Sequence, residues 1–536
     1  MSIRCGIDLG TTYSAISWYD AFNRRVETVD LEHADGAETI PSVVYFEAGG
    51  AVVVGETARN AALQHPERVV VGIKRSMGDD YKTPPIDGRE YTPQEVSAEI
   101  LKVLKADAGM YLGEPVEDVV ISVPAYFGDR QRAATQEAAG LAGLNVLELI
   151  PEPHAAALAF AVDRSQEVEN RHLLVYDLGG GTFDVTLVKS EREELGSGLA
   201  GLRITTLAKD GNRQLGGLDW DTVLAQMVAE KAMDQHGIAS PRLDAKAEAT
   251  LLKNCEDAKR QLSRVSSILV LANLQGQQVE LTRGEVERDT RDLVRTTEAL
   301  LEQVLEEAEK SHGLLREKRI RELEAEGQPR AELEEKKVRL LLCGGSTRMP
   351  MIEECVTRVM GEAPLHHRNP ELLVSVGTAY RAYLLGAEED DGKVAVETRH
   401  GAVTLLEGGG DIGNPVGVEV VEVDGEARVV RRENVVLIRP GAGHGEIFER
   451  EFATAFAGMT EIPLVFYEGG SSNPEECVRL ADVTIEGLPP NRPAGRPVKV
   501  RLWYDRNGIV CGQAMDLESR QDVEIRIDRW GSPAAA

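Results

Sequence analysis

The chain has 536 residues, a length that predicts two or more domains with sizeable cores. Its formal charge of −29 argues against nucleic acid or an anionic membrane as a partner, because both are polyanions. No stretch approaches the roughly 18 apolar residues of a transmembrane helix, and no secretory signal is visible at the N-terminus. The six cysteines occur singly, without a CxxC pair, and the ten histidines show no metal-binding spacing. We therefore expect a cytoplasmic protein with reduced thiols.

Two glycine-containing turns stand at the ends of short apolar strands. Asp8-Leu9-Gly10-Thr11-Thr12 follows residues 3–7, and Asp177-Leu178-Gly179-Gly180-Gly181-Thr182-Phe183-Asp184 follows residues 173–176. In each case the next segment is another strand, whereas the common nucleotide-binding turn leads into a helix. Two hairpins facing each other across a cleft could hold phosphates from both sides through backbone N–H groups. One such turn could be an ordinary hairpin, but two equivalent copies favour a nucleotide site.

Residues 1–388 alternate strand-like and helix-like segments, as expected of an α/β domain. Helices are expected at residues 93–111, 129–141, 219–233, 245–263 and 289–310. The intensely charged segment 314–338 is interrupted at Gly327-Gln328-Pro329 and predicts an exposed helical hairpin. Such a segment can also be a solvated face that has no partner.

The composition changes near Ala387, where a polar connector at residues 389–411 begins. Residues 412–531 are rich in β-branched and aromatic runs separated by turn residues, which predicts a β-sandwich followed by a tail at 532–536. Strands are expected at residues 448–456, 462–467, 483–485, 498–504, 509–515 and 523–527, with a hairpin turn at 505–508.

Further motifs give these two domains a family resemblance. They are Val123-Pro124-Ala125-Tyr126-Phe127-Gly128-Asp129-Arg130-Gln131-Arg132, Ile150-Pro151-Glu152-Pro153-His154-Ala155-Ala156-Ala157, Leu342-Cys343-Gly344-Gly345-Ser346-Thr347-Arg348-Met349-Pro350 and Asn369-Pro370-Glu371. With the two hairpins, their order and spacing resemble those of the DnaK-type 70-kDa heat-shock chaperones, from Arg4 to about Asp528. The resemblance implies an actin-like ATPase domain, built as a duplicated ribonuclease H-like fold, and a β-sandwich that binds peptides.

The resemblance also implies roles in binding and hydrolysing ATP. Lys74, Glu152, Asp177, Asp184 and Thr182 match the catalytic set, and Asp8 and Asp177 would place Mg²⁺ through its waters. The phosphate contacts would be Gly10, Thr11, Thr12, Tyr13, Gly179, Gly180, Gly181, Thr182, Gly216 and Gly217. An ammonium such as that of Lys74 stabilises charge on the γ-phosphoryl oxygens. Without the resemblance, Lys74 would be read as a surface lysine.

Adenosine would be bound by one helix face and one loop. Glu256, Lys259, Arg260 and Ser263 recur at the spacing of a single helical face. The resemblance pairs this face with Gly344, Gly345, Ser346, Arg348 and Glu371. Taken alone, Glu256 with Lys259 and Arg260 is an ordinary surface ion-pair array.

The resemblance further implies a peptide pocket and an internal relay. Val418, Val421, Phe452, Ala455 and Ile462 would surround the pocket, although each could equally belong to the sandwich core. Pro124 and Arg132 match the relay of the ATPase domain. Unfolded or extended polypeptides are the implied partners, with a J-domain co-chaperone and a nucleotide exchange factor as possible helpers.

The chain also departs from the family pattern. It ends at Ala536, soon after the last expected strand, so we expect the helical lid to be missing and peptide release to be fast. The coupling linker is only partly recognisable at residues 403–407, before three glycines. Pro151, His154 and Glu371 replace the usual Asn, Thr and Asp, the region 79–92 is short, and the charged segment 314–338 is extra.

Three functions remain open at this point. The first is an ATP-hydrolysing chaperone without a lid that holds apolar segments of unfolded proteins. The second is a nucleotide-switched adaptor whose β domain binds one dedicated protein. The third is a sugar or metabolite kinase, which the β domain and the Glu256–Ser263 face argue against.

Overall fold

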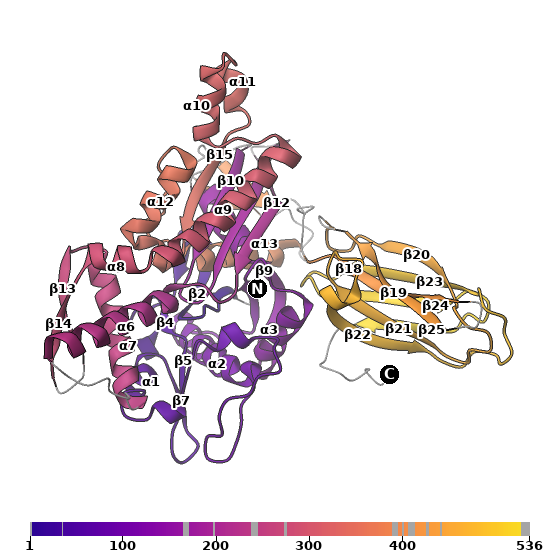
Figure 1. Cartoon of the computed structure of the whole chain (residues 1–536), viewed down its shortest axis with the longest axis horizontal. Coiled ribbons are helices and arrows are strands. Elements are labelled where there is room, and N and C mark those ends of the chain that lie inside the picture. Colours follow the sequence, from indigo (N-terminus) through magenta and orange to yellow (C-terminus); the bar gives the residue numbers. More distant parts are fainter. Residues whose placement is uncertain are drawn as a thin grey trace. The chain divides into compact units, whose positions relative to one another are not determined.

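The computed structural model describes residues 3–34, 36–163, 171–196, 199–236, 245–272, 276–388, 395–398, 401–405, 413–424, 428–439 and 442–526. Contacts between residues divide the chain into two compact units (Figure 1). The first unit contains residues 1–125 and 138–407, and the second contains residues 126–137 and 408–536.

The first unit contains a six-stranded sheet that carries the first glycine turn. Its strands are β1 (Arg4–Asp8), β2 (Tyr13–Asp20), β3 (Arg25–Thr28), β4 (Ile40–Pro41), β8 (Asp118–Val123) and β9 (Asn145–Pro151). They are ordered β3-β2-β1-β8-β9, with β4 paired to β2. Strand β1 is antiparallel to β2 and parallel to β8.

A second six-stranded sheet repeats this arrangement around the second glycine turn. Its order is β15-β10-β11-β12-β17-β16. The bounds are β10 (Arg171–Leu178), β11 (Phe183–Gly196), β12 (Leu199–Asn212), β15 (Val338–Cys343), β16 (Val396–Thr398) and β17 (Gly401–Leu405). Strand β10 is antiparallel to β11 and parallel to β15, as β1 is to β2 and β8. The predicted duplicated α/β fold is therefore confirmed, and we call the parts built on the two sheets the first and second lobes.

The helices that cover these sheets carry apolar residues at helical spacing, and these residues are buried against the strands. Helices α4 (Glu152–Asp163) and α13 (Leu373–Glu388) pack on each other and share one core with β10, Val396 and Val403. Helices α9 (Arg291–His312) and α12 (Pro350–Met360) pack with β10, β11 and β15 in another core. The cores hold both glycine turns in fixed positions at the strand ends.

Most predicted helices agree with the structure. They are α2 (Pro93–Leu112), α3 (Asp129–Leu141), α6 (Gly217–His236), α7 (Ala245–Leu262) and α9. Helix α8 (Arg283–Asp289) was not predicted; its C-cap, Thr290, is also the N-cap of α9. It also left unassigned the hairpin of β13 (Ser267–Leu271) and β14 (Gln278–Thr282), and the small sheet of β5 (Val43–Phe46), β6 (Val52–Val54) and β7 (Val69–Val71) beside α1 (Glu56–Ala61).

The charged segment forms the predicted helical hairpin, with α10 (Glu317–Ala325) and α11 (Arg330–Glu334) next to the start of β15 (Figure 1). Leu315, Ile320 and Leu333 form a small core of their own. The carboxylate of Glu317 lies buried among Arg321, Arg330 and Lys337, at 2.9, 3.0 and 2.7 Å. The hairpin is therefore a packed element with an internal ion-pair network.

The second unit contains the predicted β-sandwich. One sheet has the order β19-β18-β21-β22 and the other β20-β23-β24-β25. The bounds are β18 (Val416–Val423), β19 (Val429–Ile438), β20 (Phe448–Ala453), β21 (Ile462–Glu468), β22 (Val478–Ile485), β23 (Pro497–Tyr504), β24 (Val510–Asp516) and β25 (Asp522–Arg526). Alternating residues of both sheets form one core, and the turn at Asp505–Gly508 joins β23 to β24 as expected.

Part of the expected connector can be described. Strand β17 is parallel to β12, with Val403 opposite Ala200, and β16 is antiparallel to β17. Connector residues 389–394, 399–400 and 406–411 lie outside the described residues, as does the tail 532–536. Across the described ranges, no helix combines the length and apolar character needed to cross a membrane.

Candidate nucleotide site

The two glycine turns and the face of α7 line one cavity of about 710 Å³ in the first unit. A cavity of this volume can take a nucleotide-sized ligand. The predicted residues that line it are Asp8, Gly10, Thr11, Thr12, Tyr13, Lys74, Glu152, Asp177, Gly179, Gly180, Thr182, Gly217, Glu256, Lys259, Arg260, Ser263, Gly344, Gly345, Ser346, Arg348 and Glu371. Gly181, Gly216 and Asp184 are not among the lining residues, although they lie in the same loops and strands.

Buried carboxylates collect at the floor of this cavity. Asp177 and Asp184 face each other across the β10–β11 hairpin. Burial, together with repulsion from Glu152, raises the pKa of Asp8 to about 7 and the pKa of Asp177 to about 8. The same causes hold the pKa of Asp184 well above its usual range. A carboxylate cluster of this kind favours a cation beside it.

Lys74 supplies a positive charge within the cluster. It lies in the short helix η3 (Ile73–Ser76), and its Nζ donates to Glu152 Oε1 at 2.5 Å. Glu152 is the first residue of α4, where the helix dipole favours a carboxylate. Burial opposes the charged form of Lys74, but Glu152 and Asp8 outweigh it and raise the pKa of the ammonium. The lysine is thus buried and charged, unlike the surface lysine that its local sequence suggests.

The residues fit a magnesium-bound nucleotide. Thr12 Oγ1 is buried, lines the cavity and finds no hydrogen-bond partner within the described ranges. In that part of the chain, no three His, Cys, Asp or Glu side chains form a group that could hold a metal ion alone. Asp8 and Asp177 would therefore hold Mg²⁺ together with phosphate oxygens and water, the usual coordination of this ion.

Two serines that were not predicted, Ser14 and Ser42, hydrogen-bond the first glycine turn, residues 8–12, which we call the first phosphate loop. Ser14 Oγ accepts from the Gly10 amide at 3.1 Å and lies 2.9 Å from Ser42 Oγ. Ser42 Oγ donates to the Gly10 carbonyl at 2.8 Å. A third hydroxyl, from Ser122 on β8, donates to Asp8 Oδ1 at 3.0 Å. Ser14 follows the loop directly in β2, whereas only the pairing of distant strands brings Ser42 and Ser122 to it, so nothing local in the sequence indicates those two.

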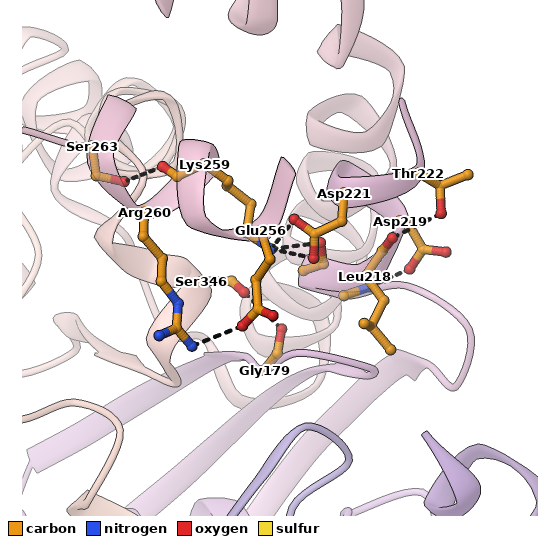
Figure 2. Close-up of polar contacts among 12 residues, drawn as sticks. Gly179, Leu218, Asp219, Asp221, Thr222, Glu256, Lys259, Arg260, Ser263 and Ser346 are labelled. Carbon is orange, nitrogen blue, oxygen red and sulfur yellow. Dashed lines mark hydrogen bonds and ion pairs between the residues drawn. The ribbon is translucent and has the colours of Figure 1, made fainter. Parts of the chain in front are cut away.

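Glu256, Lys259, Arg260 and Ser263 line the cavity as predicted. Figure 2 shows the side chains of Glu256, Lys259 and Arg260 extending from α7, while the Ser263 hydroxyl donates to the Lys259 carbonyl at 3.2 Å. Glu256 accepts from Arg260 at 2.9 Å and from Tyr13 Oη at 3.2 Å. The Arg260 guanidinium lies 4.8 Å from the centre of the Tyr13 ring. The Glu256–Arg260 ion pair expected of a surface array is therefore present. It lies at the cavity wall, however, and Glu256 also joins α7 to Tyr13 beside the first phosphate loop.

Asp221 is a further residue of this wall that the sequence analysis missed. Lys259 Nζ donates to Asp221 Oδ2 at 2.8 Å and to the Gly217 carbonyl at 2.7 Å (Figure 2). Burial raises the pKa of Asp221 to about 6, against the lowering effect of Lys259. Asp221 lies near the start of α6, four residues after Gly217. The predicted pair Gly216-Gly217 was therefore the signal in the sequence that could have pointed to Asp221.

The loop after β15 also lines the cavity. Arg348 and Glu371 form a paired contact, with Nη2 at 2.9 and 2.8 Å from the two carboxylate oxygens. Ser346 Oγ donates to the Gly179 carbonyl at 2.9 Å (Figure 2). It so joins this loop to the second glycine turn, residues 177–184, which we call the second phosphate loop. Gly345 lines the cavity beside them.

The residues predicted for peptide binding lie in the sandwich, but not all are on its surface. Val418 and Ile462 are buried in the core between the two sheets, which is the alternative that the sequence left open. Val421, Phe452 and Ala455 are half-buried. The two relay residues are both buried, and Arg132 Nε donates to the Phe127 carbonyl at 3.0 Å.

A duplicated α/β fold with two opposed phosphate loops defines the class of two-lobed, actin-like nucleotide-binding proteins. Comparison with known proteins narrows the class. The profile of the Hsp70 protein family matches residues 4–89, 84–317 and 328–534, so the chain belongs to the Hsp70 family. The unmatched residues 318–327 fall in α10 and the turn after it.

Curated relatives agree with the family profile. Proteins named chaperone protein DnaK from Thermotoga petrophila and Thermotoga maritima are each 37% identical to this chain over 532 residues. The DnaK of Thermosipho africanus is 37% identical over 531 residues. Each alignment covers 97% of this chain and 79% of the relative. These findings give no support to the metabolite-kinase alternative.

Proposed function

We propose that this protein is an ATP-dependent chaperone of the Hsp70 type that hydrolyses ATP and holds extended apolar segments of unfolded proteins. The observation that carries the proposal is the buried Lys74–Glu152 pair between two opposed phosphate loops in one cavity. The family and the names of its relatives support the same activity.

The proposed chemistry follows from the charges of the site. Backbone amides of the two loops bind the phosphates, and the ammonium of Lys74 stabilises the charge that develops on the γ-phosphoryl oxygens. Glu152 accepts a hydrogen bond from that ammonium and faces the attacking water, and Asp184 also favours the charged form of Lys74. A magnesium ion, held by Asp8 and Asp177, would neutralise charge on the phosphates. Glu256, Lys259, Ser263 and Arg348 bind the nucleoside.

Calorimetry and turnover measurements test whether the protein binds and hydrolyses ATP. The wild-type chain should bind ADP and ATP in the presence of magnesium and hydrolyse ATP. Lys74→Ala should lower turnover by on the order of 10²–10³, the loss expected for one charge-stabilising donor, while nucleotide still binds. Lys82→Ala removes an exposed lysine, whose Nζ lies 3.8 Å from Glu90, and serves as the control. Failure of the wild-type chain to take up nucleotide would refute the proposal.

A peptide array tests whether the protein holds extended apolar segments of unfolded proteins. Binding of many unrelated apolar peptides supports a chaperone, whereas one sharp ligand would support the dedicated adaptor, which neither the family nor the relatives favour. Stimulation of turnover by a J-domain protein, and of ADP release by an exchange factor, would extend the assignment.

The six cysteines are free, which suits a cytoplasmic protein.

A further inference from the structure

Arg75, the residue after the proposed catalytic lysine, reaches from the first lobe to the second. It lies with Lys74 in η3, which packs on α2, and α2 in turn packs on β2 of the first lobe. Asp219 lies in α6, which follows β12 of the second lobe directly. Its Nε donates to the Gly181 carbonyl at 2.8 Å, and its Nη2 donates to Asp219 Oδ2 at 2.6 Å. The side chains of Arg75 and Asp219 are 22% and 28% exposed, so the pair is partly screened from water. One guanidinium thus binds a backbone oxygen and a carboxylate of the opposite lobe.

Both partners of Arg75 belong to one rigid piece of the second lobe. Asp219 Oδ2 also accepts from the Gly216 amide at 2.8 Å. The amides of Gly217 and Leu218 donate to the carbonyls of Gly179 and Gly180, at 3.0 and 2.8 Å. A Cβ on Gly216 would lie 2.6 Å from the backbone of Gly181, so the start of α6 and the second phosphate loop are in close contact. A displacement of Asp219 would therefore also displace the second phosphate loop.

Neither Arg75 nor Asp219 lines the cavity, whereas Lys74 does. The pair therefore lies outside the shell that would touch a nucleotide. Its only described contacts across the cleft are with the loop and helix that carry the phosphate-binding amides. These contacts fix the distance between η3, and hence Lys74, and that loop.

We propose that Arg75 and Asp219 form an interlobe clasp that positions Lys74 against the second phosphate loop and holds the lobes closed on bound nucleotide. The proposal rests on the proposed ATPase function. Arg75 is a positioning residue, since it acts through Lys74 and the loop. Opening the lobes requires breaking a charge-assisted hydrogen bond, so the clasp slows nucleotide release as well as favouring hydrolysis.

The kinetic consequences separate this role from a purely structural one. Loss of the clasp leaves the phosphate contacts in place, so it should speed ADP release by about tenfold and slow single-turnover hydrolysis by about tenfold, the effect of losing one partly exposed charged hydrogen bond. Arg75→Lys can keep the ion pair but lacks the fork that also reaches Gly181, so it should restore only part of both rates. Asp219→Asn keeps the Gly181 contact and should also be intermediate.

The experiment measures release of a fluorescent ADP and single-turnover ATP hydrolysis on the full chain. The variants are Arg75→Ala, Arg75→Lys, Asp219→Asn and the double variant Arg75→Ala with Asp219→Asn. Arg68→Ala is the matched control. Arg68 likewise bonds a carboxylate and a carbonyl within the first lobe, Asp87 Oδ2 at 2.9 Å and the Phe46 oxygen at 3.1 Å, and is 19% exposed.

The clasp predicts that the double variant behaves like Arg75→Ala alone, because Asp219 acts in the clasp only through Arg75, which Arg75→Ala has already removed. Rates of Arg75→Ala within twofold of the wild type and of Arg68→Ala would overturn the inference, as would fully multiplicative effects in the double variant. Should Arg75→Ala fail to fold, Asp219→Asn and Arg75→Lys, which preserve side-chain volume, decide the question. A wild-type chain that binds no nucleotide would instead refute the proposed function.

Discussion

At the scale of single residues, the site depends on groups that are costly to bury. Three aspartates have raised pKa values because burial and the charge of Glu152 oppose their ionised forms. Lys74 stays charged among them. Such groups cost stability in the empty site and are retained where chemistry requires them. The cluster is therefore the strongest residue-level sign of a site rather than of a core.

Gly180 provides a test of the loop geometry at this scale. A Cβ on Gly180 would lie 1.8 Å from Thr12 Oγ1, so the Gly180→Ala variant must push the two phosphate loops apart. We expect its affinity for ADP to fall by on the order of tenfold or more, with the fold retained. Calorimetric titration measures the change. Gly284→Ala, where a Cβ would meet nothing within 4 Å, is the control, and equal affinities of the two variants would contradict the loop contact.

At the scale of elements, short polar motifs decide where helices begin. Thr282 and Glu285 form a capping box at the start of α8, and Thr92 and Glu95 form another at the start of α2. Two of the four free N-terminal amides are thereby satisfied in each helix. The box of α8 is further tied to α6, because Lys231 Nζ donates to Glu285 at 2.7 Å.

This capping box gives a pH-dependent prediction. Hydrogen bonds from Lys231 and Thr282 lower the pKa of Glu285 to about 2. A carboxylate whose pKa is lowered on folding stabilises the helix above its unfolded pKa of about 4.3 and loses that contribution as the pH falls toward 2. Hydrogen exchange should show α8 amides better protected in the wild type than in Glu285→Gln at pH 6. The difference should shrink between pH 4.5 and 2.

The second capping box controls for general acid effects. Glu95→Gln should alter the protection of α2 and leave α8 unchanged. A constant difference between wild type and Glu285→Gln across this pH range would show that the carboxylate does not titrate with folding.

At the scale of the whole molecule, the question is whether nucleotide in the first unit changes peptide binding by the sandwich. Strand β17 adds the connector to the sheet that carries the second phosphate loop, and Val403 is buried in the core of α4 and α13. A connector fixed to this sheet can respond to movements of the loop. Coupling between two sites of this kind is typically worth a factor of 5 to 150 in affinity.

We therefore expect peptide to leave about tenfold faster with ATP than with ADP. Val403→Asp would place a charge in the core and detach β17, so the two release rates should become equal. Thr404→Asp adds the same charge at the neighbouring, half-buried position and is the control. Peptide release rates from labelled peptide decide between the outcomes. Equal rates in the wild type would mean that the two units act independently.

The sequence by itself determined the two strand–glycine–strand turns, most helices, the charged hairpin and the change to a β-sandwich. These features are local, since periodicity, glycine turns and capping residues act within a few residues of one another. The helical face of Glu256 to Ser263 was likewise readable from spacing alone.

Only the tertiary structure decided which distant residues meet. Ser42 and Ser122 reach the first loop through strand pairing, and Arg75 meets Asp219 across the cleft. It also placed Val418 and Ile462 in the sandwich core, because strand register sets which face a side chain occupies. Contacts between residues far apart in the chain depend on packing of whole sheets and helices, and no short segment carries that information.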